Sequence, residues 1–570
     1  MPDSLLVLTG IAGAVYVFWL AFHRYLVRSP LDNLPSPPKS LFLGNIPDII
    51  HRQSHVWWRD VANTCGPATK LTAFFGIQML YTFDPKAMYS ILVKDTELYP
   101  KKTAAYDDFT LFIGPGLLFA EGQQHRRQRK WLNPVFSVAQ LRDVSHVFYG
   151  VAYKLEEAIR HRVSAQSSQE LDVNGWMART TLEMLGQAGL GYSFDKFTED
   201  SSDSYGEALK SFFPVINHVP LLNLFVMTLA NYMPKSLMRR VLRLAVPFPH
   251  VLRLLSISET MQKRSSEIIQ QKKSALQNGD KALMHQVGEG KDIMSVLLRS
   301  NMNAPSDSER LPDEELLAQM STFILAGMDT TSNALSRILH LLAENPDVQE
   351  KLRHELSEAR EIVGNGKDIP YDDLVKLPYL DAVCRETLRL HPPLNLIGRR
   401  AVKDMIVPLS SAVRGKDGTL VNEITLPKDT FVLLGLQACN TNKKLWGEDA
   451  YEWKPERWLQ PLPSTLEEAR VPGVYSNLMS FSGGVRSCIG FKFSQLEMSK
   501  HIAVVEVPRS PLLTAAVVAE VILTVLLPAF SFELTDKPIF WNSSAVSYPT
   551  MNKDSTRPEM LLKVKALDDC

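Results

Sequence analysis

One cysteine in a glycine-rich segment is the feature of this chain best suited to chemistry. The segment reads Phe481-Ser-Gly-Gly-Val-Arg-Ser-Cys-Ile-Gly490, with Cys488 two residues after Arg486. Glycines allow backbone angles and close approaches that side chains block, so the turn can leave the sulfur projecting from the backbone. Positive surroundings favour thiolate over thiol, and a lone thiolate suits the axial position of one metal centre. Cys-x-Gly alone would favour an inert buried cysteine, but the complete spacing favours the ligand.

The spacing Phe481-x-x-Gly484-x-Arg486-x-Cys488-x-Gly490 resembles the haem-binding signature of the haem-thiolate monooxygenases, the cytochromes P-450. Members of this family ligate haem iron through a cysteine thiolate. The resemblance implies that Cys488 is the axial ligand of haem b and that Phe481, Arg486 and Gly490 contact the cofactor. It also implies the cytochrome P-450 fold, which is mainly α with small β-sheets.

A second motif, Ala326-Gly327-Met328-Asp329-Thr330-Thr331, lies inside a helix predicted from about Pro312 to Glu344. Gly, Asp and Thr are weak helix formers, and a hydroxyl can bond backward to a helix carbonyl. Such a site can form a notch beside a metal where dioxygen and water fit. The resemblance implies that Asp329 and Thr330 are the catalytic acid–alcohol pair that relays protons. A mildly strained helix without a role is the alternative.

A third motif, Glu386-x-x-Arg389, places two opposite charges on one helix face. Most such pairs are merely solvated, but this one is followed by Leu390-His391-Pro392-Pro393 and later by Pro455-Glu456-Arg457-Trp458. The resemblance implies that Glu386, Arg389 and Arg457 form a buried structural triad that holds the cysteine loop.

Haem propionates in an apolar pocket need cations or hydrogen-bond donors. The resemblance assigns this role to His125, Arg129, Arg399 and Arg486, with His125 standing where the family commonly has tryptophan. A plain surface histidine is the alternative for His125. The neighbouring Arg126, Arg127 and Lys130 indicate a mostly solvated face. The resemblance adds that an acidic electron donor, NADPH-cytochrome P-450 reductase, docks there.

The N-terminus contains an uncharged, apolar stretch from Leu5 to Phe22. As a helix it would span about 27 Å, close to the thickness of a hydrocarbon core. Arg24 and Arg28 follow, so the positive-inside rule places the rest of the chain in the cytosol. We therefore expect a single-pass anchor over residues 1–28 at the endoplasmic reticulum membrane. A cleaved signal peptide is the alternative, but no small-residue cleavage site follows.

Three further divisions are expected along the chain. Residues 29–39 form a stiff Pro-rich linker, and residues 40–570 form the catalytic domain. Within that domain we expect a strand-rich region over 40–100, helices over 135–390 and a surface connection over 275–312. The apolar, proline-interrupted and partly basic stretch 212–255 corresponds by resemblance to a substrate-entry lid at the membrane, with ordinary core packing left open.

Composition restricts the function further. The chain has 570 residues, 45% of them hydrophobic, and equal numbers (62 each) of basic and acidic residues, which argues against a nucleic-acid partner. Its five cysteines are scattered without a Cys-x-x-Cys pair. This pattern argues against a zinc ribbon, an iron–sulfur cluster or a disulfide framework.

One segment departs from the family pattern. The strand expected after the cysteine helix reads Phe530-Ser-Phe-Glu533, but about 20 extra residues, 500–519, precede it. Pro508 and Pro511 within them must break a helix. Removing the segment joins Leu496-Glu-Met-Ser to Glu520-Val-Ile-Leu and restores one helix. We interpret 500–519 as an atypical insert, in the manner of a retained intron.

The combined prediction is a membrane-anchored monooxygenase that hydroxylates a lipophilic small molecule with O2 and NADPH-derived electrons. The apolar region from Tyr106 to Phe119, with Phe323 and Ala326, is expected to line its pocket. The chain resembles fungal microsomal members of secondary metabolism, which points to a terpenoid-like substrate. Two alternatives are a haem-thiolate isomerase or dehydratase, which intact Asp329 and Thr330 argue against, and a membrane-tethered haem protein without turnover.

Overall fold

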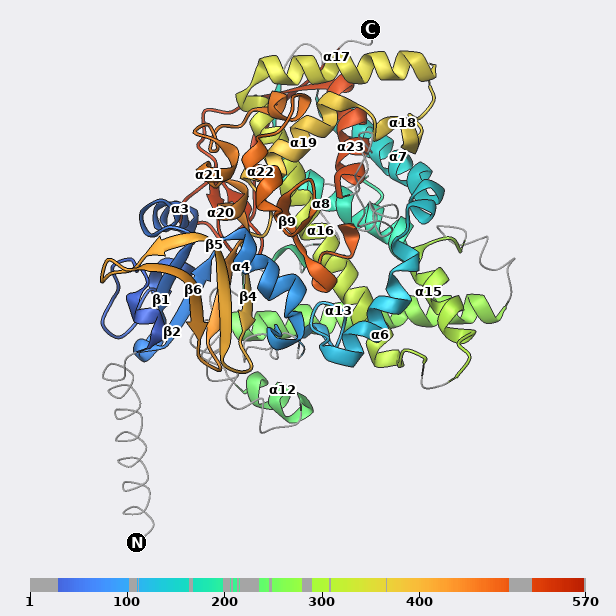
Figure 1. Cartoon of the computed structure of the whole chain (residues 1–570). Helices are drawn as coiled ribbons and strands as arrows, with labels where there is room; N and C mark the ends of the chain where they lie inside the picture. Colours follow the sequence, from blue (N-terminus) through green and yellow to red (C-terminus); the bar gives the residue numbers. More distant parts are fainter. Residues whose placement is uncertain are drawn as a thin grey trace, which may run out of the picture.

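The computed structural model describes residues 29–101, 110, 112–163, 168–197, 206, 209–212, 215, 235–244, 249–278, 290–306, 309–364, 366–491 and 515–567. The body is mainly helical with small sheets (Figure 1), as predicted. The longer helices are α3 (Ser54–Cys65), α6 (Gly122–Leu132), α7 (Val138–Arg160), α8 (Val173–Met184), α12 (Lys235–Arg243), α13 (Pro249–Gln277), α15 (Ile293–Met302), α16 (Asp313–Glu344), α17 (Pro346–Val363), α19 (Pro378–Leu390) and α23 (Ala515–Ala529). The shorter ones are α2 (Ile46–Ile50), α4 (Pro85–Tyr89), α18 (Tyr371–Leu374), α20 (Leu436–Asn440), α21 (Lys443–Trp446) and α22 (Ser464–Ala469).

The main sheet has the strand order β1-β2-β7-β4 and occupies the predicted strand-rich region plus two later strands. β1 (Ala68–Thr72) pairs antiparallel with β2 (Gln78–Thr82), which runs parallel to β7 (Phe431–Gly435). β4 (Leu396–Arg400) closes the edge antiparallel to β7, with Arg399 opposite Val432. This register places Arg399 in the interior, where it is 2% exposed.

Smaller sheets complete the β structure. β10 (Phe530–Leu534) and β13 (Leu561–Ala566) join β3 (Gln169–Asp172) in a three-stranded sheet with the order β10-β13-β3. Three hairpins are formed by β5 (Met405–Arg414) with β6 (Leu420–Leu426), β8 (Gly473–Tyr475) with β9 (Leu478–Gly483), and β11 (Phe540–Asn542) with β12 (Tyr548–Thr550). The strand expected at Phe530–Glu533 is therefore present as β10. Strands β1, β2, β4, β5 and β6 lie together on one side of the molecule (Figure 1).

Helix α16 crosses the middle of the molecule (Figure 1) and packs most extensively against α8. Three acidic residues, Asp313, Glu314 and Glu315, follow Pro312 in its first turn, where they complement the helix dipole. The helix ends before Pro346, which opens α17. It is continuous through Asp329 and Thr330 and buries much of its length, so it is a rigid support for those residues.

Some expectations need correction or fall on residues outside the described ranges. The expected surface connection over 275–312 is wrong for 293–302, because α15 buries Ile293, Met294 and Leu297, and Lys272 binds buried Asp292 at 2.9 Å. The anchor at 1–28 and residues 492–514 of the insert region lie outside the described residues. In the part of the chain that is described, no helix combines the length and apolar character needed to cross a membrane.

Residues 29–39 lie against the domain instead of standing apart from it. Leu31 and Leu34 are each 1% exposed, and the carbonyl of Pro35 accepts a hydrogen bond of 2.8 Å from the Lys70 amide of β1. The Pro-rich segment is therefore attached to the main sheet along its length.

Candidate functional site

The cysteine loop follows β9 and closes on itself. The Cys488 amide donates to the Phe481 carbonyl at 3.0 Å, and the Ser487 amide donates to the Gly484 carbonyl at 3.0 Å. Gly484 has φ +71°, and a Cβ there would lie 2.1 Å from the Leu92 carbonyl oxygen. Only glycine fits this position. The predicted need for glycine is confirmed at Gly484, whereas at Gly490 a Cβ would make only an ordinary 3.6 Å contact with Cys488 Sγ.

The Cys488 residue is exposed, yet burial raises the pKa of its thiol. Both observations hold if the sulfur lines a hollow inside the protein. The amides of Gly490 and Phe491 and the charges of Arg129 and Lys101 lower this pKa in part. The nearby positive charges thus act in the expected direction, toward thiolate, but desolvation outweighs them and the pKa stays raised. Binding to a metal deprotonates a cysteine by itself.

A group of cations lies close to this loop. Arg129 of α6 donates to the Ser487 carbonyl at 2.8 Å, and Arg486 binds Glu121 at 2.8 Å. Burial and the charges of Arg486, Lys101 and Arg129 lower the pKa of His125 to about 3. Buried His125 is therefore a neutral hydrogen-bonding side chain beside these cations and not a surface histidine. Arg486, expected to add positive charge near the cysteine and to contact the cofactor, pairs with Glu121.

Lys101 belongs to the same group and was not predicted. Burial, followed by the charges of Arg399 and Arg486, lowers its pKa to about 7. Its amide donates to Glu121 at 3.0 Å. No local pattern around Lys101 marks it, because its neighbours come from α6, β4 and the cysteine loop.

The cation group fits the carboxylates of a haem. The described residues of this group include the cations Lys101, Arg129, Arg399 and Arg486, the neutral His125, and the carboxylate of Glu121, which pairs with Arg486. Desolvated positive charges require anionic partners. Propionates beside a cysteine ligand would meet that requirement, so the residues present suit a haem.

Asp329 and Thr330 occupy adjacent positions of α16 but make separate contacts. The Thr330 hydroxyl donates to the Ala326 carbonyl at 2.6 Å, the backward bond expected from sequence. Asn333 Nδ2 donates to Asp329 Oδ1 at 3.2 Å and to its carbonyl at 2.8 Å. Burial raises the pKa of Asp329 to about 7, while Lys210 and Asn333 act to lower it. Asp329 is thus a carboxyl that exchanges its proton near neutral pH.

The small residues of this motif have separate tasks. Ala326 is exposed although it lies in the central helix, consistent with a face toward a hollow. A Cβ at Gly327 would lie 2.8 Å from a Leu185 methyl carbon. Gly327 therefore lets the segment 185–190 pack on α16. The notch expected beside the metal would then lie at Ala326.

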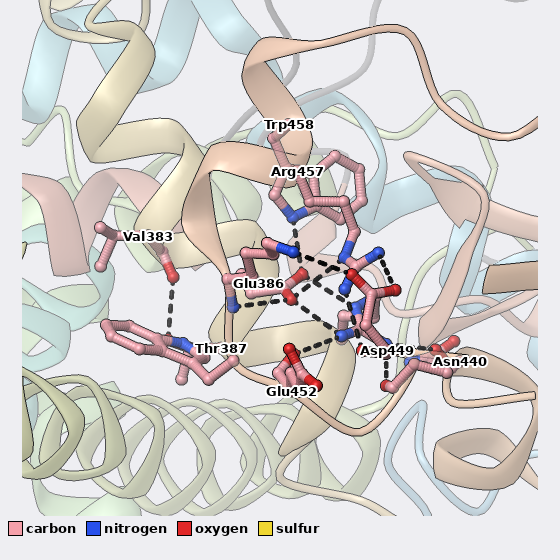
Figure 2. A network of polar contacts seen from close by, with 12 residues as sticks. Val383, Glu386, Thr387, Asn440, Asp449, Glu452, Arg457 and Trp458 are labelled. Carbon is pink, nitrogen blue, oxygen red and sulfur yellow. Dashed lines mark hydrogen bonds and ion pairs between the residues drawn. The ribbon is translucent and has the colours of Figure 1, made fainter. Parts of the chain in front are cut away.

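The predicted triad is present and buried (Figure 2). Arg389 makes two 2.8 Å bonds to Glu386, and both side chains are 0% exposed. Arg457 lies 3.3 Å from Glu386 and 3.0 Å from Asp449, and Trp458 Nε1 donates to Glu386 at 3.0 Å. The Glu386 carboxylate is thus saturated by donors, as a buried charge must be.

Asn440 links this network to the cysteine loop. Arg389 donates to the Asn440 carbonyl at 3.1 Å. The Asn440 side chain then accepts from the Met479 amide at 2.7 Å and donates to Ser480 at 2.9 Å. Met479 and Ser480 belong to β9, the strand that leads into the cysteine loop. Asn440 was not predicted, because a single asparagine carries no sequence signal.

The expected substrate pocket is described only in part. Residues 102–109 and 111 lie outside the described residues, as does most of the lid. In the remainder, Phe112, Ile113 and Leu117 are buried in the core, and Phe323 packs edge-on against Phe136 with centroids 5.3 Å apart. An accessible cysteine in a glycine-rich loop, a group of basic side chains beside it and a helix with an acid–alcohol pair together match a protein of the haem-thiolate class.

Comparison with known proteins identifies the family within that class. A family profile described as cytochrome P-450 matches residues 34–505. The chain is 89% identical over 567 residues to a ganoderic acid synthetase of Ganoderma lucidum, and 100% of each chain is covered. It is 45% identical over 555 residues to one cytochrome P-450 monooxygenase of Postia placenta, with 97% of each covered. A second from that fungus is 47% identical over 564 residues, with 99% of this chain and 98% of the other covered.

This chain belongs to the cytochrome P-450 family. It is accordingly a monooxygenase of fungal secondary metabolism, and its cofactor is haem b held by a cysteine thiolate. These findings confirm the predicted fold class, enzyme class and cofactor. The isomerase and non-catalytic alternatives are not favoured.

Proposed function

We propose that Cys488 is the axial ligand and that Lys101, His125, Arg129, Arg399 and Arg486 hold the haem propionates. The observation that carries the proposal is one accessible sulfur on which the charges of Lys101 and Arg129 act, with Arg399 and Arg486 acting in turn on Lys101. When bound, haem with a thiolate ligand activates dioxygen, so that one oxygen atom enters a C–H bond and the other leaves as water.

The residues of α16 would manage protons for this reaction. Thr330 Oγ1 is held by the Ala326 carbonyl, on the helix turn where Ala326 is exposed. The Asp329 carboxyl, with a pKa of about 7, can take up and release a proton near neutral pH. Asp329 is bonded to Asn333 and has no hydrogen bond to Thr330, so transfer between them requires intervening water. The triad and Asn440 would hold the cysteine loop during turnover.

The proposed setting is the endoplasmic reticulum membrane, with residues 1–28 as the anchor and the catalytic domain in the cytosol. NADPH-cytochrome P-450 reductase is the proposed electron donor. Its docking face would include Arg126 and Lys130 of α6, which are exposed, whereas Arg127 bonds the inward carboxylate of Glu315 at 2.5 Å. Arg126 also pairs with Glu97, at 2.8 Å, where both side chains are largely exposed.

The proposed substrate is a lipophilic, terpenoid-like molecule. The support is the relative named a ganoderic acid synthetase, together with the apolar region around Phe112 and Ile113 that packs near α16. Hydroxylation of an unactivated carbon is the proposed reaction.

Residues 500–519 are proposed to be foreign to the functional protein. The family match ends at residue 505, inside the segment, although the strands β10 and β13 follow it. Glu520, at its edge, is fully buried with neither carboxylate oxygen bonded to a described residue. Sequencing of the messenger RNA tests this, and transcripts that all retain the segment would contradict it.

Two single cysteine variants, one at Cys488 and one at Cys439, give the sharpest test of the site. The reduced holoprotein with carbon monoxide should show the red-shifted Soret band of thiolate ligation. Cys488→Ala should abolish that band, whereas Cys439→Ala, which removes another buried thiol, should preserve it. A band that survives in haem-loaded Cys488→Ala would overturn the assignment.

The reaction is tested with the reductase and a panel of terpenoid substrates. We expect substrate-dependent NADPH consumption and a product one oxygen atom heavier, detected by mass spectrometry. NADPH consumption without any oxygenated product from the panel would contradict the proposed substrate class while leaving the haem assignment intact.

A further inference from the structure

A cavity lies beside the α16 helix, and on the side toward the proposed haem site its lining reaches Asn333, the residue bonded to Asp329. Its volume is about 510 Å³, within the range of small-molecule pockets. Its walls come from α3, α16, the end of α19 and the β11–β12 hairpin. Cys488, Thr330 and the cations assigned to the propionates are absent from its lining. Arg337 projects into it seven residues beyond Thr330, about 10 Å further along the helix axis.

The lining of this cavity is positive and aromatic. Its described lining residues include Arg59, Arg337 and Lys553 but no aspartate or glutamate. Five aromatic side chains contribute the apolar surface, namely Trp58, Tyr81, Tyr451, Phe540 and Trp541. Such a wall suits a ligand with a flat apolar body and a negative group.

Each of the three cations lies over one of these rings. The Arg337 guanidinium carbon is 3.5 Å from the Trp541 ring centroid, and that of Arg59 is 4.3 Å from the Tyr451 centroid. Lys553 Nζ is 5.5 Å from the Phe540 centroid. Within the described part of the chain none of the three forms an ion pair, so the rings hold the cations in place while their charge stays available.

Arg337 forms the deep end of the cavity. Its Nε is buried without a hydrogen-bond partner in the described structure, and burial holds the pKa of the guanidinium well below its usual range. The Trp541 ring over it is fixed in turn, because Trp541 Nε1 donates to His340 Nδ1 at 3.0 Å. Among the described residues, Glu344 is the one acidic side chain whose charge acts on the Arg337 guanidinium, and it offsets only part of the cost of burial. An anionic ligand would offset more of that cost.

Two histidines also face the cavity, His55 and His391. Burial and the charge of Arg337 lower the pKa of both, so each is neutral near pH 7 and can donate a hydrogen bond without adding charge. The deep end therefore carries a single positive charge, while Arg59 and Lys553 are exposed near the mouth. One charge with aromatic walls matches a monocarboxylate better than a phosphate.

We propose that this cavity binds an amphipathic monocarboxylic acid with a ring skeleton, whose carboxylate pairs with Arg337 while a second molecule occupies the haem site. The body of the acid would lie against Trp541 and Tyr451. The proposal concerns a separate ligand and holds whatever the substrate of the haem site is.

The test uses full-length holoenzyme with an iron-coordinating azole bound, so that the haem site is filled. Titration calorimetry with dehydroabietic acid, a tricyclic monocarboxylic acid, should show one bound molecule per chain. Arg337→Gln should weaken this binding at least about tenfold, as expected for loss of a charge-assisted contact. Arg337→Lys should weaken it less. Arg142→Gln, which removes an exposed arginine outside the cavity, should bind like the wild type.

Three outcomes would overturn the proposal. They are equal binding of methyl dehydroabietate, unchanged binding by an Arg337→Gln protein that retains the azole spectrum, and displacement of the azole by the acid. Inorganic phosphate that binds as tightly as the acid would likewise contradict a carboxylate site. The azole spectrum shows in every case that the variant is folded and haem-loaded.

Discussion

The Asp329 carboxyl is buried, and the charge of Lys210 and the hydrogen bond from Asn333 offset only part of the cost of burying its charged form. Its pKa is therefore raised. A carboxyl whose pKa is raised to about 7 in the folded state keeps a proton that the unfolded chain releases near 4. Its contribution to stability is therefore present at low pH and is lost as pH rises from about 4 to about 7. The same affinity suits a group that must both bind and release protons at neutral pH.

The first prediction concerns this residue. Asp329→Asn should remove the part of the pH dependence of unfolding that lies between about 4 and 7, so that the variant gains stability over wild type as pH rises. Product formed per NADPH should vary around pH 7 in wild type and lose that variation in the variant. Urea unfolding and coupling assays across this pH range measure both effects. An unchanged pH profile would remove Asp329 from the relay.

Thr330→Ala is the companion variant. Loss of the hydroxyl should divert reducing equivalents to peroxide while leaving the pH dependence of unfolding intact, because Thr330 does not titrate. Peroxide assays measure the diversion. Unchanged coupling would exclude Thr330 from the mechanism.

At the scale of elements, the triad joins α19 to the segments around Asp449 and Arg457, and Asn440 extends it to β9. These contacts cross four separate stretches of chain. The cysteine loop thus depends on ion pairs far from it in sequence. The Glu386 carboxylate accepts hydrogen bonds on both oxygens, and such full hydrogen bonding is the condition under which a buried ion pair is tolerated.

The second prediction follows from this arrangement. Arg457→Ala should destabilise the protein by about 3–5 kcal/mol, because Glu386 and Asp449 lose a shared partner, and should lower haem retention. Arg142→Ala is the control, since its pair with Asp372 is about half exposed (51% and 55%) and such pairs contribute at most about 1 kcal/mol. Denaturant titration with haem absorbance measures both variants. Equal small losses in the two would show that the triad is dispensable.

At the scale of the whole molecule, the carboxyl of Glu520 is buried without a hydrogen-bond partner among the described residues. Glu520 of α23 is 0% exposed, and burial followed by the charge of Asp381 raises the pKa of its carboxyl well above the usual range. Arg385, the nearby cation, binds Asp381 at 2.7 Å instead. A buried carboxyl without a hydrogen-bond partner is consistent with an insert that ends at residue 519, directly before Glu520.

The third prediction is that Glu520→Gln stabilises the protein by about 1–3 kcal/mol at neutral pH, because an unpaired buried carboxyl carries its full desolvation cost. The gain should grow as pH rises above about 4.5, since the raised pKa makes the native state lose stability there. Glu386→Gln is the matched control, a buried carboxylate with saturated bonds, and should destabilise. Thermal unfolding measures both, and a destabilising Glu520→Gln would contradict the interpretation.

Residues at fixed spacing on one stretch of chain were predictable from sequence. The cysteine loop, the Asp329-Thr330 pair and Glu386-x-x-Arg389 each act within a few residues, so local geometry determines their arrangement. The strand at Phe530 and the helix from Pro312 were predictable for the same reason. The surface connection expected over 275–312 was wrong for 293–302, because α15 is buried there and Asp292, which precedes it, pairs in the interior with Lys272 of α13.

The sequence by itself therefore determined the family, the cofactor and the order of the motifs. Only the tertiary structure decided that Lys101 joins the cation group, that Arg486 binds Glu121, that Asn440 connects the triad to β9, and that Arg337 stacks on Trp541. The physical reason is that burial and charge at a point depend on side chains from several distant elements. Cys488 is affected in the same way, because desolvation by the folded chain has a larger effect on the pKa of its thiol than the neighbouring amides of Gly490 and Phe491.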